Sequence, residues 1–217
     1  QEYMCEFIDS SGVLLPYELI AKCEAPICAA DTDAPRFIGM DIGRSHDLSV
    51  ITELAKVGDR LILVRKEELH KKSFQEQLEV LSSILSAKAV QRCCIDATGL
   101  GMMFAEEAKR RHGGRIEAVT FSHKTKGEMY STMRKRFEER TIQIPNNDRN
   151  LREDLHAIQK LVSVGGNISY SAPRSADGHS DRGASLALAI RAAETKGYYF
   201  TPFVIKKTTN YFRKRTY

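Results

Sequence analysis

Runs of apolar residues separated by glycine and polar turns divide the chain from residue 36 onward into regular elements. Residues 36–43, 48–57 and 60–69 have the composition of strands, and Gly58-Asp59 between the last two is typical of a β-hairpin. Three strands in direct succession predict an antiparallel meander at the start of the domain.

Helices and strands alternate after the meander. The predicted helices cover residues 73–87, 100–112, 126–140, 148–160 and 180–194, and the predicted strands cover 90–96, 115–121 and 141–144. Ser73 and Ser180 are the expected N-caps of the first and the last helix, and the last helix has an amphipathic pattern. This order predicts an α/β fold in which crossover-connected strands extend the meander.

The remaining segments have weaker patterns. Residues 1–35 contain Pro16, Pro26 and Pro35 and are expected to form an arm or linker rather than core. Residues 161–172 predict a hairpin turning on Gly165-Gly166-Asn167. The chain therefore divides into an arm at 1–35, a domain at 36–195 and a basic, aromatic tail at 196–217.

The composition suits one globular domain. The chain has 217 residues, of which 42% are hydrophobic and 28% charged, which is enough apolar material for one core. Its five cysteines are odd in number and form no CxxC pair, so a reduced protein is expected and a zinc site is not. No signal peptide or membrane-spanning apolar run is found, so we expect a soluble protein without membrane contact.

Positive charge is concentrated in one part of the chain. The net charge is +5, and residues 109–140 alone contain ten Lys or Arg against four Glu. Such a window has two interpretations, a solvated helix face or a surface for a polyanion.

Asp41 is the first unusual residue, because it interrupts the apolar strand at 36–43. A carboxylate in such a strand costs several kcal/mol unless a partner compensates its charge. Gly39 and Gly43 lie two residues away on either side and would leave room for close approach of ions and phosphate, although a turn explains Gly43 equally well.

Two further carboxylates occupy positions that bring them toward Asp41. Asp96 ends the strand at 90–96, which is a suitable neighbour of the first strand, and Asp181 begins the last helix. Convergent carboxylates repel each other, and a hard divalent cation with oxygen ligands relieves the repulsion. Two such ions activate a water molecule and stabilise the leaving oxygen in phosphodiester cleavage.

Each acid also has a structural explanation. Asp41 is able to accept backbone N–H groups in a turn, and Asp96 is a suitable cap for the following helix. Asp181 is favoured at a helix start by the macrodipole alone. The metal hypothesis rests on the three acids together.

Three motifs containing these acids resemble a known family. DIG at 41–43 with Asp47 after it, IDATGLG at 95–101 and GHSDRGASLALA at 178–189 are similar to motifs of the RNase H-like nuclease domain of viral large terminase subunits. These subunits are the DNA-packaging motors of tailed double-stranded DNA bacteriophages. The first twenty residues resemble the segment that joins the terminase ATPase to its nuclease domain, and the resemblance covers about residues 1–195.

The resemblance implies a ribonuclease H/RuvC-type fold, with a mixed central sheet that starts with three antiparallel strands and has helices on both faces. It implies a metal-dependent endonuclease that cuts concatemeric viral DNA during packaging with little sequence specificity. Asp41, Asp96 and Asp181 would hold two Mg²⁺ or Mn²⁺ ions, with Asp41 bridging them. His179 and Asp47 are accessory candidates, although a loop histidine and a turn aspartate explain them as well.

One part of a terminase is missing from the sequence. No GxxxxGK[ST] motif occurs, so packaging ATP hydrolysis is not expected of this chain. The resemblance implies a C-terminal nuclease portion that works on double-stranded DNA in the host cytoplasm with an ATPase domain, a small terminase subunit and the portal. The isolated domain is expected to be monomeric.

DNA binding requires cations that offset the repulsion from the acids. The candidates for phosphate contact are Arg44, Lys109, Arg110, Arg111, Lys124, Lys126, Arg134, Lys135, Arg136 and Arg182. The hairpin at 161–172 is either an ordinary sheet edge or, by the resemblance, an element beside the active site that gates DNA access. The tail is either a DNA or portal contact or an end without fixed structure.

Three other functions remain open. DIG and DATGLG faintly resemble the phosphate loops of actin-like ATPases and sugar kinases, but such proteins need two domains and are longer. A RuvC-like resolvase or a transposase-type nuclease shares the acid pattern but not the first segment. A non-catalytic docking module would have no need of all three acids.

Overall fold

The computed structural model describes residues 12–26, 33–43, 48–162, 168–171 and 180–195. The helices are α1 Tyr17–Ala21, α2 Phe74–Leu85, α3 Gly101–His112, α4 His123–Glu138, α5 Arg149–Ala157 and α6 Asp181–Glu194, with a 3₁₀ turn at Gly113–Arg115. The strands are β1 Glu24–Ala25, β2 Arg36–Asp41, β3 Leu48–Val57, β4 Arg60–His70, β5 Val90–Asp96, β6 Ile116–Val119, β7 Ile142–Pro145, β8 Gln159–Val162 and β9 Ile168–Ser171.

A seven-stranded mixed sheet forms the centre of the molecule, in the order β1-β7-β4-β3-β2-β5-β6. Strands β2, β3 and β4 pair antiparallel, which confirms the predicted meander, and β5 pairs parallel with β2 on the other side. Strand β6 continues the parallel part beyond β5, and β7 joins β4 in parallel. The expected neighbourhood of the first and fourth strands of the domain is therefore confirmed.

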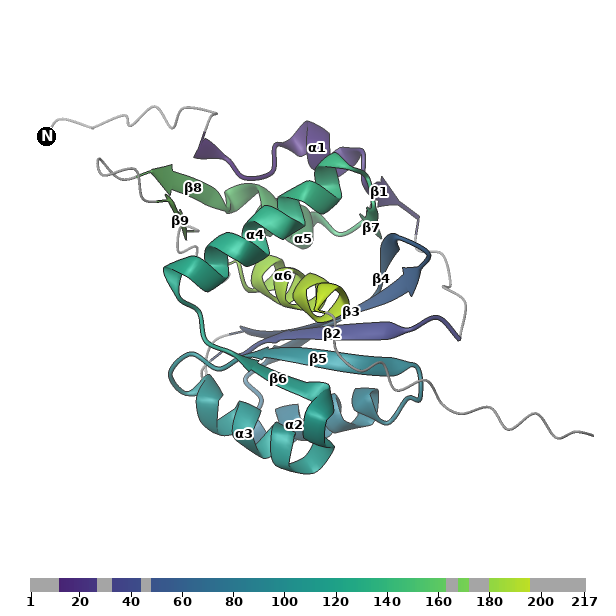
Figure 1. Ribbon diagram of the computed structural model, residues 1–217, viewed down its shortest axis with the longest axis vertical. Helices are drawn as coiled ribbons and strands as arrows, with labels where there is room; N and C mark the ends of the chain where they lie inside the picture. The colour runs from purple at the N-terminus through teal and green to yellow at the C-terminus, as the bar shows by residue number, and fades with distance from the viewer. Residues whose placement is uncertain (1–11, 27–32, 44–47, 163–167, 172–179, 196–217) are drawn as a thin grey trace, which may run out of the picture.

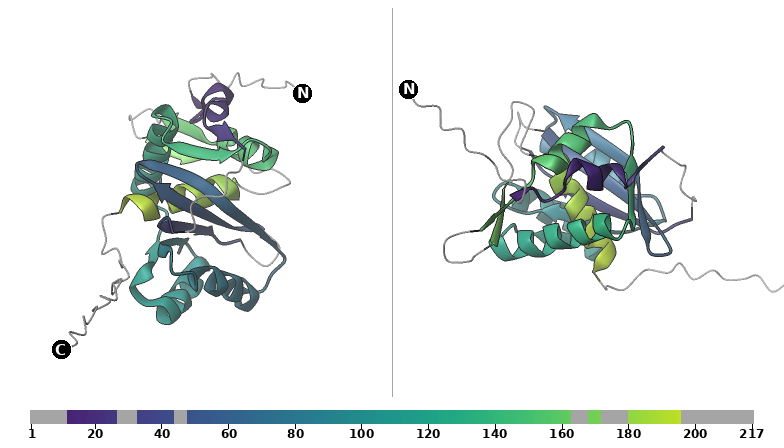
Figure 2. Two further views of the ribbon diagram at one scale, coloured as in Figure 1. Left: turned by 90° about the vertical axis from the view of Figure 1, so that its right-hand side faces the viewer. Right: turned by 90° about the horizontal axis from the view of Figure 1, so that it is seen from above.

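Helices cover both faces of the sheet. Helices α1, α4, α5 and α6 lie on one face and α2 and α3 on the other (Figure 1), and a turned view shows the same two layers (Figure 2). Each layer has its own buried apolar cluster, one around α6 and α4 and one between the sheet and α2 and α3. The fold expected from the sequence, with helices on both faces of a mixed sheet, is observed.

Helix α6 packs unusually close to β2 because Gly39 lacks a side chain. A Cβ atom at Gly39 would lie 2.0 Å from the carbonyl oxygen of Ser185 and 2.2 Å from the backbone nitrogen of Ala189. The Ser185 hydroxyl also hydrogen-bonds the Thr52 hydroxyl of β3 at 2.7 Å. Helix packing therefore explains Gly39, and our interpretation of it as room for ions and phosphate is wrong.

Helix α6 is also more buried than its sequence suggests. Eleven of its residues, including Arg182 and Ser185, are buried, so the amphipathic interpretation is wrong. Helix α6 lies between the sheet and helices α4 and α5, and this position leaves it little solvent-facing surface (Figure 1).

The two predicted N-caps have different outcomes. Ser73 caps α2 through a capping box with Glu76, as expected. Ser180 precedes α6 but makes no side-chain capping bond, because its backbone has a left-handed conformation with φ of 63°. Ser180 therefore occupies the predicted N-cap position, but the carboxylate of Asp154, not the Ser180 side chain, accepts the backbone N–H of Arg182 in the first turn.

Residues 12–26 pack into the core, contrary to our expectation that residues 1–35 form an arm. Leu14, Leu15 and Ile20 are at most 1% exposed. Strand β1 pairs parallel with β7, and the backbone N–H of Leu14 donates to the carbonyl of Ile158 at 2.8 Å. Pro16 sits just before α1, where its missing N–H is not needed, so a proline that suggested a linker marks a helix start.

Smaller differences concern element ends. Helix α4 begins at His123 with Ser122 as its cap, and α5 ends at Ala157 so that residues 159–162 can form β8. Strand β8 pairs antiparallel with β9, as the predicted hairpin requires, while its turn at 165–167 is outside the described residues. None of the helices described here has both the length and the apolar character to span a membrane.

Candidate active site

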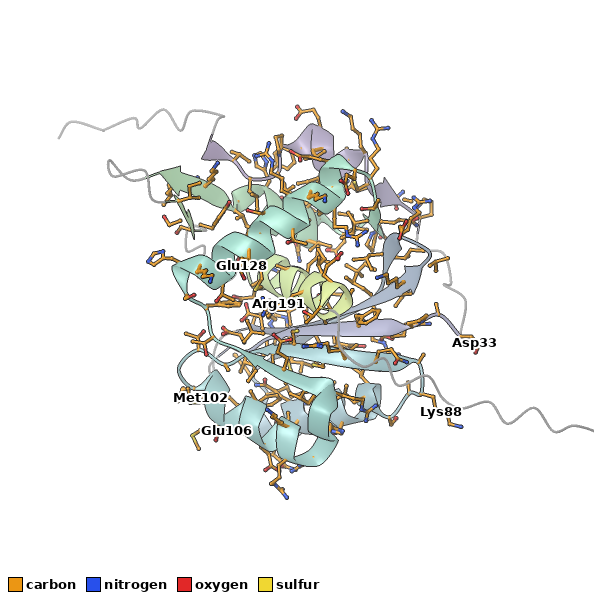
Figure 3. The ribbon with its side chains drawn as sticks, in the orientation of Figure 1. Asp33, Lys88, Met102, Glu106, Glu128 and Arg191 are labelled. Carbon is orange, nitrogen blue, oxygen red and sulfur yellow. The ribbon has the colours of Figure 1, made fainter. Side chains whose placement is uncertain are left out.

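Asp41 and Asp96 lie side by side at the carboxyl ends of two neighbouring parallel strands. Asp41 is the last residue of β2 and Asp96 the last of β5, and the register pairs Met40 with Ile95 immediately before them. Figure 3 shows Met102 of α3, just beyond Asp96, at one end of the sheet, with Asp33 and Lys88, which precede β2 and β5, at the other. The ends of β2 and β5 that carry Asp41 and Asp96 therefore lie next to each other at the same end of the sheet.

Asp181, the first residue of α6, approaches the same region. Burial raises the pKa of Asp41 well above its ordinary value, and the charges of Asp181 and Asp96 raise this pKa further. Burial also raises the pKa of Asp96, although the N–H of Thr98 donates to its Oδ1 at 2.9 Å. The structure thus brings Asp41, Asp96 and Asp181, hereafter the site carboxylates, into electrostatic reach of one another.

Helix α4 contributes two side chains that interact electrostatically with the site carboxylates. The Lys126 ammonium partly offsets the rise in the pKa of both Asp41 and Asp96, and it also lies 5.3 Å from the centre of the Phe121 ring. One helical turn later, Tyr130 is buried, and burial followed by the charges of the site carboxylates raises the pKa of its hydroxyl. Sequence reasoning missed Tyr130, and its i+4 spacing from Lys126 is the signal that would have indicated a shared face.

The turn after Asp96 is fixed by backbone packing. A Cβ at Gly101 would lie 2.2 Å from the Asp96 carbonyl oxygen, so the start of α3 sits directly against the strand end. The N-cap of α3 is Leu100, without a side-chain bond. Asp96 therefore does not cap the helix, and the structural explanation of Asp96 as an N-cap is not realised.

The donor set suits a hard divalent cation. The site carboxylates offer oxygen ligands, and their mutual repulsion is of the kind that such a cation relieves. Within the part of the chain that the structure describes, no three or more His, Cys, Asp or Glu side chains are gathered as a preformed metal cage. The fit rests on the chemistry and electrostatic coupling of the three acids.

Two of the predicted DNA contacts have partners within the protein. Arg182 is buried and forms ion pairs with Glu68 and Asp154, so it is not available for phosphate contact and its assignment is wrong. Arg136 has a side chain 14% exposed, pairs with Glu194 and donates to the carbonyl of Asp59. These partners hold α4 against the end of α6 and the β3–β4 turn, so they give Arg136 a structural role, while its contact with DNA stays a prediction.

The other described candidates are on or near the surface. Arg110 and Arg111 both pair with Glu107 on α3, and Arg134 and Lys135 pair with acids one turn later on α4. Lys109 and Lys124 are exposed and Lys126 is partly buried beside the site. The predictions for Arg44, Asp47 and His179 concern residues outside those described.

Comparison with known proteins identifies the family. The family model of the terminase RNase H-like domain matches residues 38–193, a span that includes all three site carboxylates and most of the chain. The chain belongs to this terminase family. No curated protein matches the sequence.

Solved terminase nucleases share the fold. The large terminase nuclease from thermophilic phage G20c is 21% identical with a TM-score of 0.68, covering 83% of this chain and 98% of that one. The Thermus phage P74-26 nuclease domain is also 21% identical, with a TM-score of 0.65 and coverage of 84% and 97%. Other structures of the G20c nuclease contain bound magnesium, cobalt or zinc.

The match to a large terminase covers a smaller share of that protein than the matches to the nuclease domains do. The HK97 bacteriophage large terminase is 9% identical with a TM-score of 0.64, and the match covers 82% of this chain but 43% of that protein. The matched region thus spans nearly all of the G20c nuclease and less than half of the HK97 large terminase.

Proposed function

We propose that this terminase domain is a metal-dependent endonuclease that hydrolyses phosphodiester bonds of double-stranded viral DNA during genome packaging. The observation that carries the proposal is the electrostatic coupling of Asp41, Asp96 and Asp181, which come from β2, β5 and α6 of a terminase RNase H-like fold. The bound magnesium, cobalt and zinc in the G20c nuclease support divalent cations as the cofactors.

The geometry gives Asp41 the central role. The charges of both other site carboxylates raise the pKa of Asp41, which supports Asp41 as the shared ligand that two cations would have. When bound, Mg²⁺ or Mn²⁺ supplies water activation and neutralises charge on the leaving oxygen. Asp96 is oriented by the Thr98 N–H, and Asp181 by the start of α6.

Helix α4 is proposed to position the DNA backbone. The Lys126 ammonium lies near two site carboxylates and offsets their repulsion toward an incoming phosphate. Tyr130 is buried on the same helix, and we propose that it helps to exclude water from the site on the side of α4. Lys109, Lys124 and Lys135 extend the positive surface along α3 and α4, and because charge of this kind reads the phosphate backbone, we propose little sequence preference.

The wider context follows from the family. We propose that the domain works in the host cytoplasm beside an ATPase domain, with a small terminase subunit and a portal as packaging partners. The HK97 large terminase, of which this domain would span less than half, supports a longer assembly around the nuclease.

A plasmid assay tests the proposed activity. The purified chain is incubated with supercoiled plasmid and Mn²⁺ or Mg²⁺, with and without EDTA, and compared with Asp41→Asn. We expect nicking and linearisation that require the metal and fall at least about 100-fold in the variant, since loss of even an outer partner of a metal ligand costs up to that much. Asp59→Asn is the matched control. Asp59 lies in the turn after β3, and the β3 residue paired with Asp41 is at the other end of that strand.

Two results would contradict the proposal. Cleavage that persists in Asp41→Asn would show that the activity arises elsewhere or from a contaminant. Cleavage insensitive to EDTA would exclude the metal mechanism.

A further inference from the structure

The first turn of α6 is anchored by a buried arginine. The Arg182 side chain is 7% exposed, and its Nε and Nη2 donate to the two carboxylate oxygens of Glu68 on β4, each at 2.8 Å. This bidentate geometry fixes the orientation of the guanidinium as well as its position. The anchor connects residues that are 114 positions apart in the chain.

A second carboxylate holds the backbone of the same turn. The Asp154 Oδ2 atom on α5 accepts the backbone N–H of Arg182 at 3.1 Å and lies 3.5 Å from the guanidinium Nη1. Asp154 thereby satisfies a first-turn N–H that the left-handed Ser180 does not cap with its side chain. Glu68, Arg182 and Asp154 are called the α6 clamp below.

The α6 clamp is itself braced. The Lys66 ammonium lies 2.8 Å from Glu68 Oε1 and 2.5 Å from Asp148 Oδ2, and Asp148 caps α5 through the N–H of Leu151. The start of α6 is therefore tied at once to β4 and to α5. Each of these elements is packed into the main sheet or against α6.

The cost of such an arrangement suggests a purpose beyond stability. Buried ion networks seldom stabilise a fold more than apolar residues of the same volume, because the charges must be desolvated. Their best-attested use is to fix one geometry among several. The residue joined directly to Arg182 is Asp181, which the negative charge of Asp41 repels.

We propose that the α6 clamp positions the Asp181 carboxylate for divalent-cation binding, which makes Glu68, Arg182 and Asp154 positioning residues of the active site. The inference rests on the proposed function of the site. The clamp holds the Asp181–Arg182 peptide itself through its N–H, so the carboxylate can stay near Asp41 without the helix start unwinding.

Metal binding by the full 217-residue chain tests the proposal. Isothermal titration with Mn²⁺ compares the unmodified chain with Glu68→Gln and Asp154→Ala. We expect the dissociation constant to rise about 10-fold in each variant, the effect typical of losing a partner that orients a metal ligand. Arg182→Lys keeps the charge but not the two-pronged contact and is expected to bind Mn²⁺ with intermediate affinity.

Neighbouring residues give matched controls. Glu67 follows Lys66 on β4 and points to the opposite face of the sheet from Glu68, and Glu153 precedes Asp154 on α5 in an exposed pair with Arg149. Glu67→Gln and Glu153→Ala are expected to bind Mn²⁺ as the unmodified chain does.

A second measurement separates positioning from general stability. Hydrogen exchange without metal is expected to speed up at the first-turn amides of α6 in Glu68→Gln while the amides of β2 and β5 keep their protection. Unchanged exchange and unchanged Mn²⁺ affinity in the clamp variants would overturn the clamp and leave the nuclease proposal intact. If the unmodified chain bound no Mn²⁺ and cut no DNA, the proposed function would fail first.

Discussion

Two acidic clusters meet at the first turn of α6, one through Asp181 and one through Arg182, and they differ in how their charge is balanced. The site carboxylates have the Lys126 ammonium as a cationic neighbour, and the pKa of Asp41 is raised well above its ordinary value. In the α6 clamp, hydrogen bonds from Arg182 and Lys66 lower the pKa of Glu68 to about 2. Similar side chains thus acquire opposite proton affinities within one region of the fold.

The clamp is not uniform, since burial raises the pKa of Asp154 despite the opposing effect of Arg182. Desolvation outweighs attraction there because Asp154 has a longer contact with the guanidinium, 3.5 Å against 2.8 Å for Glu68. The comparison indicates that a cluster with its own cations is structural, whereas one with unbalanced charge is suited to take up cations from solution.

The largest expected change in stability comes from removing Arg182, the central cation of the α6 clamp. Arg182→Met would leave Glu68 and Asp154 buried without their main partner and should lower the free energy of unfolding by about 4 kcal/mol. Urea denaturation measures the change. Arg149→Met, which removes an arginine 84% exposed, should change it by less than about 0.5 kcal/mol. A small effect of Arg182→Met would contradict the structural role of the clamp.

A methyl group between β2 and α6 should disturb both clusters at once. Gly39→Ala places a Cβ against backbone atoms that cannot rotate away, so we expect a loss of about 3 kcal/mol in the same denaturation assay. Gly114→Ala is the control, because a Cβ there meets nothing within 4 Å. Equal stability of the two variants would rule out the close contact.

Neutralising one of the site carboxylates should stabilise the metal-free chain. Asp41→Asn removes mutual repulsion and should raise the free energy of unfolding at neutral pH by roughly 1 kcal/mol, while Asp59→Asn should not. Because the pKa of Asp41 is raised on folding, its unfavourable charge disappears as the pH falls through that pKa. The difference between variant and unmodified chain should therefore shrink on acidification, and a constant difference would contradict this origin.

Glu68 should show the opposite pH dependence. Its pKa falls from 4.5 to about 2 on folding, so its contribution to stability is present above about pH 4.5 and is lost as the pH falls toward 2. Thermal unfolding of Glu68→Gln and the unmodified chain should differ at about pH 6 and converge near about pH 2. Glu67→Gln should follow the unmodified chain throughout.

The smallest effect concerns Lys126. If its ammonium meets a DNA phosphate, Lys126→Met should reduce the slope of log affinity against log salt by about one, measured by fluorescence anisotropy with a duplex. Lys88→Met, at the far end of the sheet in Figure 3, should leave the slope unchanged. Equal slopes for both variants would show that Lys126 does not contact a DNA phosphate.

The sequence predicted the parts of the site that depend on chain order. The neighbouring strands that end at Asp41 and Asp96 follow from a meander extended by a crossover, and the structure confirms that pairing. The metal role of the site carboxylates stays a prediction until binding is measured.

The wrong sequence-based interpretations concern residues whose contacts in the fold are remote in sequence. Arg182 looked like a DNA contact because it adjoins Asp181, but Glu68 and Asp154 decide its role, and no local pattern indicates them. Gly39 was misinterpreted for the same reason, since its contact lies on a helix about 150 residues later along the chain, which only tertiary packing can reveal.

The N-terminal segment has a practical consequence for anyone who shortens this protein. A chain begun at residue 36 would retain Asp41, Asp96 and Asp181, yet it would uncover the apolar surface beneath Leu14, Leu15 and Ile20 and leave β7 without its β1 neighbour. An unprotected strand edge beside exposed apolar surface promotes aggregation. Domain limits drawn from the three acid motifs alone would thus keep the set of carboxylates but expose a surface that favours aggregation.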